Sequence, residues 1–289
     1  MQRGAWLMIT SALAFSVMTV LVKLAGERLP SQEIVVARAL VSLVLSYALL
    51  RSAGVSPWGQ DRKWLWFRGF LGFAGLSCVY GAVTHLPLAE ATVIQFLHPP
   101  MAAILARIFL GEAISGRIVA ASGLSFLGVL FVARPALLFA GPFASAGRAP
   151  LDPLWVGVAI AGAFFSASAY VVVRRLSARE DPLVIVFYFP LVTLPAALPT
   201  IAWNFVWPVG LDWLWLMGVG LMTQVGQVSL TRGLTLLSAA KGTALSYLQV
   251  VFAALWGLLI FGDRPDPLTI VGGGLVIASS IFVSRDRSR

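Results

Sequence analysis

The sequence predicts an all-α membrane protein whose ten transmembrane helices form two inverted repeats of five helices. Of its 289 residues, 59% are hydrophobic and only 11% are charged, less than half the charged fraction of roughly 25% found in soluble domains. The apolar residues fall into blocks of about 20, the length of a helix that crosses a hydrocarbon core. The two halves of the chain also resemble each other, which predicts the repeats.

Charge and cysteine content exclude several other classes of protein. The formal net charge is +9, but Lys and Arg stand singly or in pairs between apolar blocks, so no basic cluster is available for nucleic acid. Cys78 is the only cysteine and lies inside an apolar block, which excludes a disulfide or a thiolate metal site within one chain. We therefore expect a lipid bilayer around the chain, no nucleic-acid partner, and no metal or other cofactor.

Ten apolar blocks bounded by charged residues, Gly or Pro are the candidate spans. In chain order they cover residues 4–24, 34–50, 65–82, 88–110 and 118–133, then 154–173, 183–206, 214–230, 242–261 and 268–283. Unpaired backbone groups are costly in lipid, so each block is expected to be a helix, and the alternating pattern of barrel strands is absent. The first block follows Arg3 and has a cleaved signal peptide as its alternative, but no A-x-A-like cleavage site follows it.

The distribution of Lys and Arg predicts the orientation of the chain. With the N-terminus in the cytoplasm, 15 of these residues fall on the inner side, Arg68 among them, and 5 on the outer side. The positive-inside rule therefore places both termini in the cytoplasm. Arg38 falls within the second span, where it either extends its side chain to the outer interface or attracts a carboxylate; we favour the first.

An internal duplication is visible when the sequence is shifted against itself by 151 residues. Residues 86–134 then align with 237–285 and give twelve identical pairs among 49, including Gly111 with Gly262 and Arg134 with Arg285. Because five crossings are an odd number, the second copy enters the membrane from the opposite side, as in many secondary transporters. We predict a first repeat over residues 1–134, a linker over 135–153, and a second repeat over 154–289.

Polar side chains within spans usually face protein or water rather than lipid, so they locate the interior. Gln95 and His98 share one helical face of the fourth span, and a depth of roughly 15 Å places His98 near the midplane. Their equivalents in the ninth span are Ser246 and Gln249. A second polar face follows the eighth span at Gln224, Gln227 and Thr231, and its counterparts in the third span include Tyr80.

The roles of these groups remain open on the sequence alone. They either line a cavity or only join helices through hydrogen bonds. His98 is either a proton-coupling group or a neutral hydrogen-bonded partner. Glu90, at the outer end of the same helix, either pairs with a substrate ammonium, accepts a proton, or caps its helix.

Proline and glycine predict kinks and close packing. Pro99 and Pro100 remove backbone donors from the fourth span, whereas the ninth span has Val250 and Val251 in their places, so we expect a kink there in the first copy only. In the seventh span, Pro190, Pro195 and Pro199 either interrupt the helix and free carbonyls toward a cavity, or form passive kinks that neighbouring helices compensate, which is the more frequent case. Close helix packing is expected at Gly69, Gly72, Gly75 and Gly272 to Gly274. A homodimer contact through the tenth span is the alternative for its glycines.

Sequence signatures of catalysis are missing. No H-E-x-x-H, G-x-S-x-G or G-x-x-x-x-G-K-[ST] sequence occurs, and the spans contain too few acids and histidines to assemble a metal site. We therefore do not expect an enzyme, and we do not expect ATP-driven transport by this chain alone.

The chain resembles the ten-helix, two-repeat EamA-type members of the drug/metabolite transporter superfamily over nearly its whole length. The residues that carry the resemblance are Lys23, Pro30, Arg38, the run LPLAEATVIQFLHPPMAAILARIFLGE, Gly123, and the second-copy echo ending in Gly262 and Asp263. The resemblance implies an inner-membrane exporter of small metabolites with a central cavity between the repeats. The LPLAEAT stretch and the aromatic-rich second half also look like bacterial exporters of amino acids, especially aromatic ones. The double Pro after His98 departs from the single Pro of the family, so the resemblance assigns His98 no role.

We therefore predict a secondary transporter that exports an aromatic or large neutral amino acid, or a similar small metabolite, by alternating access. The expected substrate-binding residues are Tyr80, Gln95, His98, Gln224, Gln227, Ser246, Tyr247, Gln249 and Trp256, with Glu90 and His98 as candidate coupling groups. The amides and hydroxyls would hold a zwitterionic end, and aromatic walls would accept the side chain. The alternatives are an exporter of drugs, nucleosides or quaternary amines, a channel, and a membrane-embedded enzyme.

Overall fold

The computed structural model describes residues 2–86, 88–133, 152–201, 205–261 and 267–285. Within these ranges the chain is helical and contains no strand. The first half forms α1 Gln2–Ala25, α2 Ser31–Ser52, α3 Arg62–His85, α4 Leu88–Gln95, α5 His98–Leu110 and α6 Gly116–Ala133. The second half forms α7 Pro153–Leu176, α8 Pro182–Ala197 with the 3₁₀ turn η1 Leu198–Ile201, α9 Asp212–Leu236, α10 Ala239–Leu245, α11 Leu248–Phe261 and α12 Pro267–Arg285.

These helices make ten spans, because α4 with α5 and α10 with α11 each form one interrupted span. Six helical stretches are long and apolar enough to cross a membrane by length and composition, and two shorter apolar helices accompany them. The outside of the bundle carries large apolar side chains: Ile108, Phe109 and Leu259 are each more than 60% exposed. A soluble monomer rarely exposes so much apolar surface, so the predicted all-α membrane fold is confirmed.

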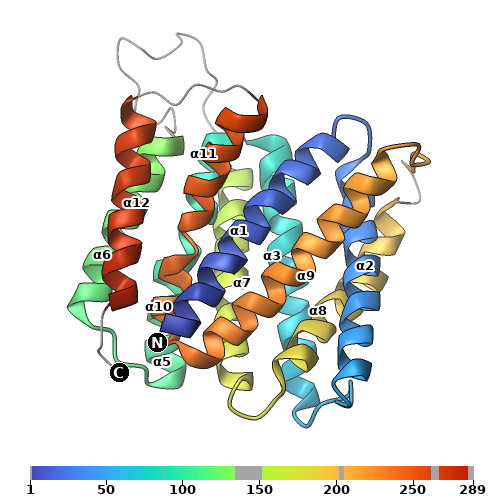
Figure 1. The fold of residues 1–289 in the computed structure, drawn as a ribbon, viewed down its shortest axis with the longest axis horizontal. Coiled ribbons are helices and arrows are strands. Elements are labelled where there is room, and N and C mark those ends of the chain that lie inside the picture. Colours follow the sequence, from blue (N-terminus) through green and yellow to red (C-terminus); the bar gives the residue numbers. More distant parts are fainter. Residues whose placement is uncertain (1, 87, 134–151, 202–204, 262–266, 286–289) are drawn as a thin grey trace.

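The two halves are built alike, and corresponding helices begin 150 or 151 residues apart, as Gln2 of α1 and Pro153 of α7 do. Their packing follows the same relation. Helix α1 packs along α9 as α3 packs along α7, while α2 contacts α8 and α6 contacts α12 (Figure 1). Inverted repeats of this kind are related by a pseudo-two-fold axis in the membrane plane. The start of α1 and the end of α12 lie at the same end of the bundle, called the terminal face below (Figure 1).

Local sequence signals explain where several helices begin and end. Asp152 and Asp181 precede prolines at the first position of α7 and α8, and each carboxylate accepts a hydrogen bond from the backbone two residues later. This combination of an N-cap acid with Pro at the first helical position satisfies orphan backbone donors. At the other end of α5, Gly111 has a φ of 64°, a left-handed conformation that stops a helix and favours glycine.

Both interrupted spans break at equivalent positions, which corrects the expectation of a kink in the first copy alone. Helix α4 gives way to α5 at Phe96 and Leu97, and α10 gives way to α11 at Ser246 and Tyr247. The second break needs no proline, because the Ser246 hydroxyl donates to the Thr243 carbonyl at 2.6 Å and the Tyr247 hydroxyl donates to the Phe96 carbonyl across the axis at 3.1 Å. Tertiary contacts therefore stabilise a turn that the local sequence does not require.

The prolines of α8 follow the second of the two expectations, in which neighbouring helices compensate the missing donors. Pro190 and Pro195 lie inside a helix that continues through both, and only Pro199 lies in the 3₁₀ turn that follows. Most of the first half of α8 is buried, including Phe187 and Phe189. Packing on all sides therefore keeps the helix continuous despite the missing backbone donors.

Glycines allow three pairs of helices to approach closely, as predicted. A Cβ at Gly128 of α6 would lie 2.6 Å from the carbonyl of Gly272 in α12, and a Cβ at Gly272 would meet the Gly128 carbonyl at the same distance. Gly69 of α3 faces α8, and Gly75 of α3 faces Ser166 of α7. In contrast, a Cβ at Gly273 or Gly274 would meet no atom within 4 Å, so the prediction of close packing is wrong for these two glycines.

Adjacent glycines of α12 provide a matched test of this packing. We expect Gly272→Ala to lower the stability of the protein by about 1–3 kcal/mol, because the added methyl group overpacks the contact with α6. Gly273→Ala is expected to be neutral or to stabilise by up to about 1 kcal/mol through helix propensity. Thermal unfolding of the two purified variants in detergent measures the difference. Equal midpoints would show that the Gly128–Gly272 contact does not limit the separation of α6 and α12.

Candidate functional site

Two buried arginines meet near the middle of the bundle. Arg38 of α2 is 6% exposed and Arg68 of α3 is 4% exposed. Their guanidinium carbons lie 5.6 and 5.1 Å from the centroid of the same ring, that of Phe189 in α8. Arg38 and Phe189 are separated by 151 residues in sequence, so they occupy equivalent positions of the two repeats and contact each other across the pseudo-two-fold axis.

Neither arginine forms an ion pair with an acid of the described residues. Arg68 donates from Nη2 to the Gln227 Oε1 at 3.4 Å, while its Nε and Nη1 are buried without a hydrogen-bond partner. For Arg38, the polar contact is Nη1 to the Met18 sulfur at 3.9 Å. An Arg at the centre of a membrane helix costs about 2.5–3.5 kcal/mol even on the most lenient scale. Such residues are retained where they serve a function.

A glycine of α3 makes room for the Arg68 guanidinium. A Cβ at Gly72, one helical turn after Arg68, would lie 2.5 Å from Arg68 Nη1 and 2.6 Å from the Phe189 ring. Any larger residue would displace the guanidinium from the ring. The absent side chain of Gly72 thus shapes the space that Arg68 occupies.

The polar face of α9 lies beside the arginines, as the helical spacing predicted. Gln224 is buried and its Oε1 accepts a hydrogen bond from Ser46 of α2 at 3.1 Å, but its Nε2 has no partner. Thr231 is buried and its hydroxyl is also without a partner. Gln227 reaches Arg68. Buried polar groups left unpaired in this way are rare and point to a ligand or water.

A second group of predicted residues gathers where the two interrupted spans cross. The His98 Nδ1 lies 2.9 Å from the Gln95 carbonyl, and its Nε2 lies 3.3 Å from the Ser246 hydroxyl of the other repeat. The Tyr247 ring stacks on Phe96 with centroids 5.6 Å apart. These contacts join first-repeat and second-repeat residues near the axis.

Tyr170 of α7 connects the two groups. Its ring centroid lies 5.2 Å from that of His98, and its hydroxyl is an electrostatic neighbour of Arg68. Tyr80 is an electrostatic neighbour of Arg38 in the same way. Gln227 thus joins the α9 face to the arginine pair, and Tyr170 lies against His98 at the crossing of the interrupted spans.

The remaining predicted residues lie elsewhere or outside the description. The Trp256 indole donates to the Ser16 hydroxyl at 2.9 Å, which ties α11 to α1. Gln249 is partly buried near the crossing. The side chain of Glu90 falls outside the described residues.

Sequence reasoning missed the arginine pair. Arg68 had been counted among the inner-side charges, and Arg38 was expected to extend to the outer interface; the burial of both residues shows that these two expectations are wrong. The sequence of α3 does contain one indication of the Arg68 site, because Arg68 and Gly72 are four residues apart and share a helical face. Nothing in the apolar sequence of α8 distinguished Phe189.

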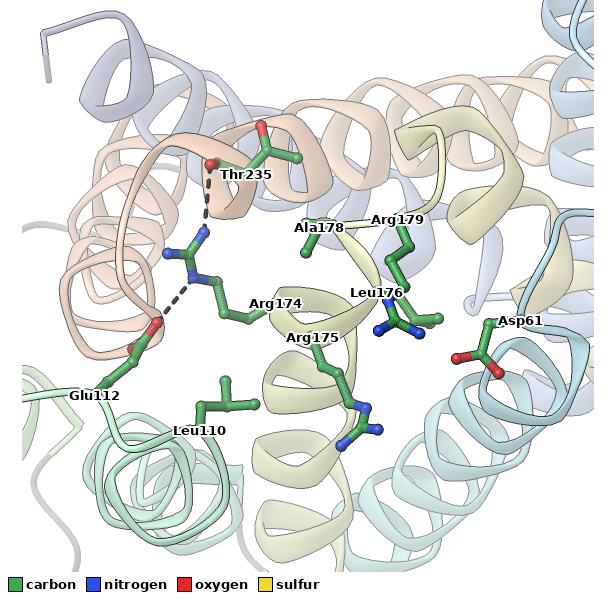
Figure 2. A pocket seen from close by; sticks show the side chains of 10 residues that line it. Asp61, Leu110, Glu112, Arg174, Arg175, Leu176, Ala178, Arg179 and Thr235 are labelled. Carbon is green, nitrogen blue, oxygen red and sulfur yellow. Dashed lines mark hydrogen bonds and ion pairs between the residues drawn. The ribbon is translucent and has the colours of Figure 1, made fainter.

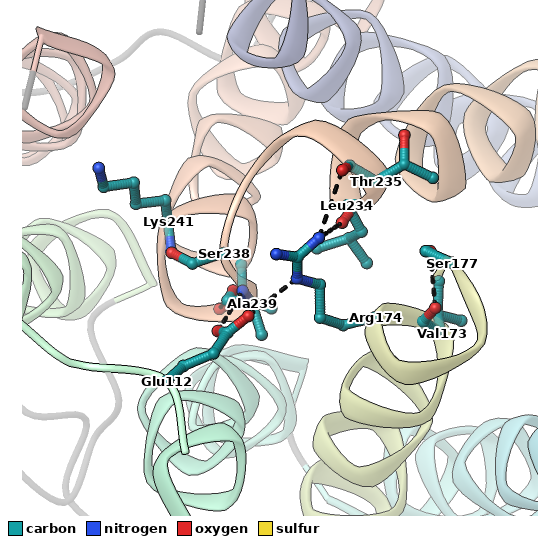
Figure 3. Close-up of polar contacts among 10 residues, drawn as sticks. Glu112, Val173, Arg174, Ser177, Leu234, Thr235, Ser238, Ala239 and Lys241 are labelled. Atoms are coloured by element: carbon teal, nitrogen blue, oxygen red, sulfur yellow. Dashed lines mark hydrogen bonds and ion pairs between the residues drawn. The ribbon is translucent and has the colours of Figure 1, made fainter. Parts of the chain in front are cut away.

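An ion pair closes the seam of the repeats at the terminal face. Glu112, just after α5, accepts from Arg174 Nε of α7 at 2.8 Å and from the backbone of Ala239 in α10 at 2.9 Å. Arg174 also donates to the carbonyls of Leu234 and Thr235 at the end of α9. Figure 3 shows that this one pair joins the first repeat to three helices of the second.

A pocket of about 530 Å³ adjoins this ion pair at the ends of α3, α5, α7 and α9 (Figure 2). Its charged lining residues are Asp61, Glu112, Arg174, Arg175 and Arg179. Arg175 stacks over Trp64, with its guanidinium carbon 4.1 Å from the ring centroid. The pocket thus has an excess of positive charge and faces the end at which the chain begins.

The fold and this site define a membrane transporter built from two inverted repeats, with a polar cluster at their seam. The chain belongs to the EamA-like transporter family, whose model matches residues 2–134 and 153–285. It is therefore a transporter and not an enzyme.

Individual relatives support the same class. The chain is 35% identical to the pseudopaline exporter CntI of Pseudomonas aeruginosa strain UCBPP-PA14, over 99% of this chain and 98% of that protein. It is 24% identical to the riboflavin transporter of Vibrio cholerae, over 98% and 93% of the two chains. One crystal structure superposes with a TM-score of 0.81 at 19% identity, covering 96% of this chain and 95% of the other, which supports the fold alone.

A substitution tests whether the ion pair of Glu112 with Arg174 keeps the terminal face closed. We expect Glu112→Gln to raise the labelling rate of a cysteine placed at buried Ala106 by about tenfold or more in a Cys78→Ala background. The reason is that weakening a charged hydrogen bond by about 1.5–3 kcal/mol shifts an opening equilibrium by that factor. Maleimide labelling of the purified protein measures the rate.

Arg175→Gln is the matched control for this test, because its side chain lines the same pocket but is exposed and stacks on Trp64. Labelling should stay at the parent rate in this variant. Equal rates in Glu112→Gln and the parent protein would contradict a closing role for the ion pair.

Proposed function

We propose that the chain is a secondary transporter that exports an amino acid or a similar small metabolite across the bacterial inner membrane by alternating access. One observation carries this proposal. Arg68, Gln224 and Thr231 hold buried polar atoms without partners where the two repeats meet. Polar groups kept inside a membrane bundle at such a cost mark the path of a solute.

The two repeats, residues 1–134 and 154–289 joined by the linker 135–153, would rock against each other about the breaks of the interrupted spans. In this proposal the terminal face is cytoplasmic, as the distribution of Lys and Arg predicts. The ion pair of Glu112 with Arg174 would open to admit the metabolite from the cytoplasm and would close before its release outside. Export as the direction is supported by the similarity of nearly the whole chain to the pseudopaline exporter CntI.

The polar cluster offers complementary groups for an amino acid. The arginines would hold its carboxylate, since a guanidinium binds carboxylates with charge-assisted hydrogen bonds. The amides of Gln224 and Gln227 would contact the amino group, and the rings of Tyr80 and Tyr170 would form the apolar wall. Gln95, His98, Ser246, Tyr247 and Gln249 would line the adjoining crossing, and Trp256 would support it from α1.

The arginines also weigh against one alternative. Two buried cations that have no acidic partner within the described part of the chain repel a quaternary amine, so export of that class is disfavoured. The second candidate function is export of pseudopaline, which is favoured by 35% identity over 99% of this chain to an exporter of that compound.

Transport by the purified protein in liposomes tests the proposal directly. Labelled amino acids, with pseudopaline as a separate arm, are loaded inside or outside, with and without a pH gradient. We expect saturable flux of at least one of these compounds. Absence of flux for every compound would refute the proposal, and flux that is independent of the gradient would exclude proton coupling.

Single substitutions test the proposed lining. We expect Gln95→Ala, His98→Ala, Gln227→Ala or Gln249→Ala to reduce transport by roughly tenfold for each lost contact of about 1.4 kcal/mol, without loss of membrane insertion. Thr19→Ala, at an exposed position of α1, is the control. Unchanged kinetics in all four variants would discard the lining.

A further inference from the structure

We infer that Arg38 and Arg68 form a two-point carboxylate site, and that the metabolite carries at least two carboxylates and a net negative charge. This inference rests on the proposed transport function and narrows its substrate class. It differs from the neutral amino acid expected from the sequence, because the structure places two cations, and not one, beside the same ring.

Arg38 and Arg68 lack a counter-charge within the described part of the chain. Four acids of the described residues form hydrogen bonds or ion pairs near helix ends: Glu33 with the backbone of Val206, Glu180 with that of Gln60 and Asp61, Glu112 with Arg174, and Asp212 with Arg28. None of these acids pairs with Arg38 or Arg68. A cation buried without a partner is strongly disfavoured unless a ligand supplies the opposite charge.

The Arg68 guanidinium has hydrogen-bond donors that no group of the protein accepts from. Arg68 Nε and Nη1 are buried and have no acceptor, which leaves three of the five guanidinium N–H groups unused. Gln227 holds the remaining nitrogen, Nη2, at 3.4 Å. Gly72 leaves open the space into which the guanidinium fits. The side chain is therefore positioned, and its unused donors are those that a carboxylate satisfies.

Two cations, Arg38 and Arg68, lie beside the same ring. Like charges near one ring repel each other in a medium of low dielectric constant. A single carboxylate would leave the pair with a net positive charge, whereas two carboxylates neutralise it. Because the guanidiniums belong to α2 and α3 and lie 5.6 and 5.1 Å from the Phe189 centroid, a ligand with two carboxylates offers one to each of them.

The basic pocket at the terminal face offers an anion a route toward the arginine pair. The basic pocket at the terminal face includes Leu176 of α7, and Tyr170, the neighbour of Arg68, lies six residues earlier on the same helix. Six residues of helix correspond to about 9 Å. An anion gathered by Arg175 and Arg179 would thus be drawn to a position about two turns below the arginine pair.

Ligand-induced stabilisation of the purified protein tests the site. The probes are succinate, glutarate, citrate and L-glutamate, each at equal ionic strength, and glutaramide and L-glutamine are the neutral analogues. We expect at least one carboxylate to raise the thermal midpoint by about 2 °C or more, and we expect no shift with the analogues. Arg38→Gln and Arg68→Gln should each abolish the shift, while Arg51→Gln, at the exposed end of α2, should keep it.

A second measurement separates binding from a structural role. Arg68→Met removes the uncompensated cation while keeping much of the side-chain volume. We expect its thermal midpoint without ligand to rise above that of the parent protein and its transport to fall at least about tenfold. A midpoint that falls, or a carboxylate shift that persists in Arg68→Gln, would overturn the inference.

Failure of this inference differs from failure of the proposed function. If a neutral amino acid such as phenylalanine crosses liposomes equally well with the parent protein and with the Arg38→Gln/Arg68→Gln double variant, transport stands and the carboxylate site is refuted. If no carboxylate and no neutral amino acid crosses in either, the proposed function itself is refuted.

Discussion

Hydrocarbon supplies neither hydrogen bonds nor counter-charges, and this constraint determines how the chain places its polar groups. At the two ends of the bundle the constraint is relaxed, and there the acids cap helices or pair with arginines, as Asp181 and Glu112 do. Inside the bundle, Arg38 and Arg68 lack acidic partners among the described residues. The free energy of that arrangement is unfavourable in isolation, and this is the physical basis of the carboxylate site inferred above.

Duplication gives the scaffold its symmetry, and divergence gives the site its chemistry. Arg38 and Phe189 descend from equivalent positions, and so do Phe96 and Tyr247, and each pair meets at the axis. With arginine at both positions, two further like charges would meet beside Arg68; with phenylalanine at both, Arg68 would be the one cation left at the ring. The difference between the copies places a cation against an aromatic ring, which is a favourable contact.

Patterns of charge and hydropathy were sufficient to predict the ten spans and their pairing into repeats, because these depend on composition over about 20 residues. The polar spacing on α9 also predicted correctly that Gln224 and Gln227 face the interior. The break at Ser246 and Tyr247 was not predictable, because it depends on a hydrogen bond to Phe96 from the other repeat. Phe189 was not predictable either, since α8 is apolar on all sides and offers no periodicity.

The reciprocal contact of Gly128 with Gly272 gives α6 and α12 a distinct mechanical character. Backbone touches backbone there, and these two helices pack chiefly against each other at one edge of the bundle (Figure 1). A pair packed so closely is expected to move as one rigid unit. Fluorophores or antibody epitopes attached to its outer surface would therefore report on the position of that unit.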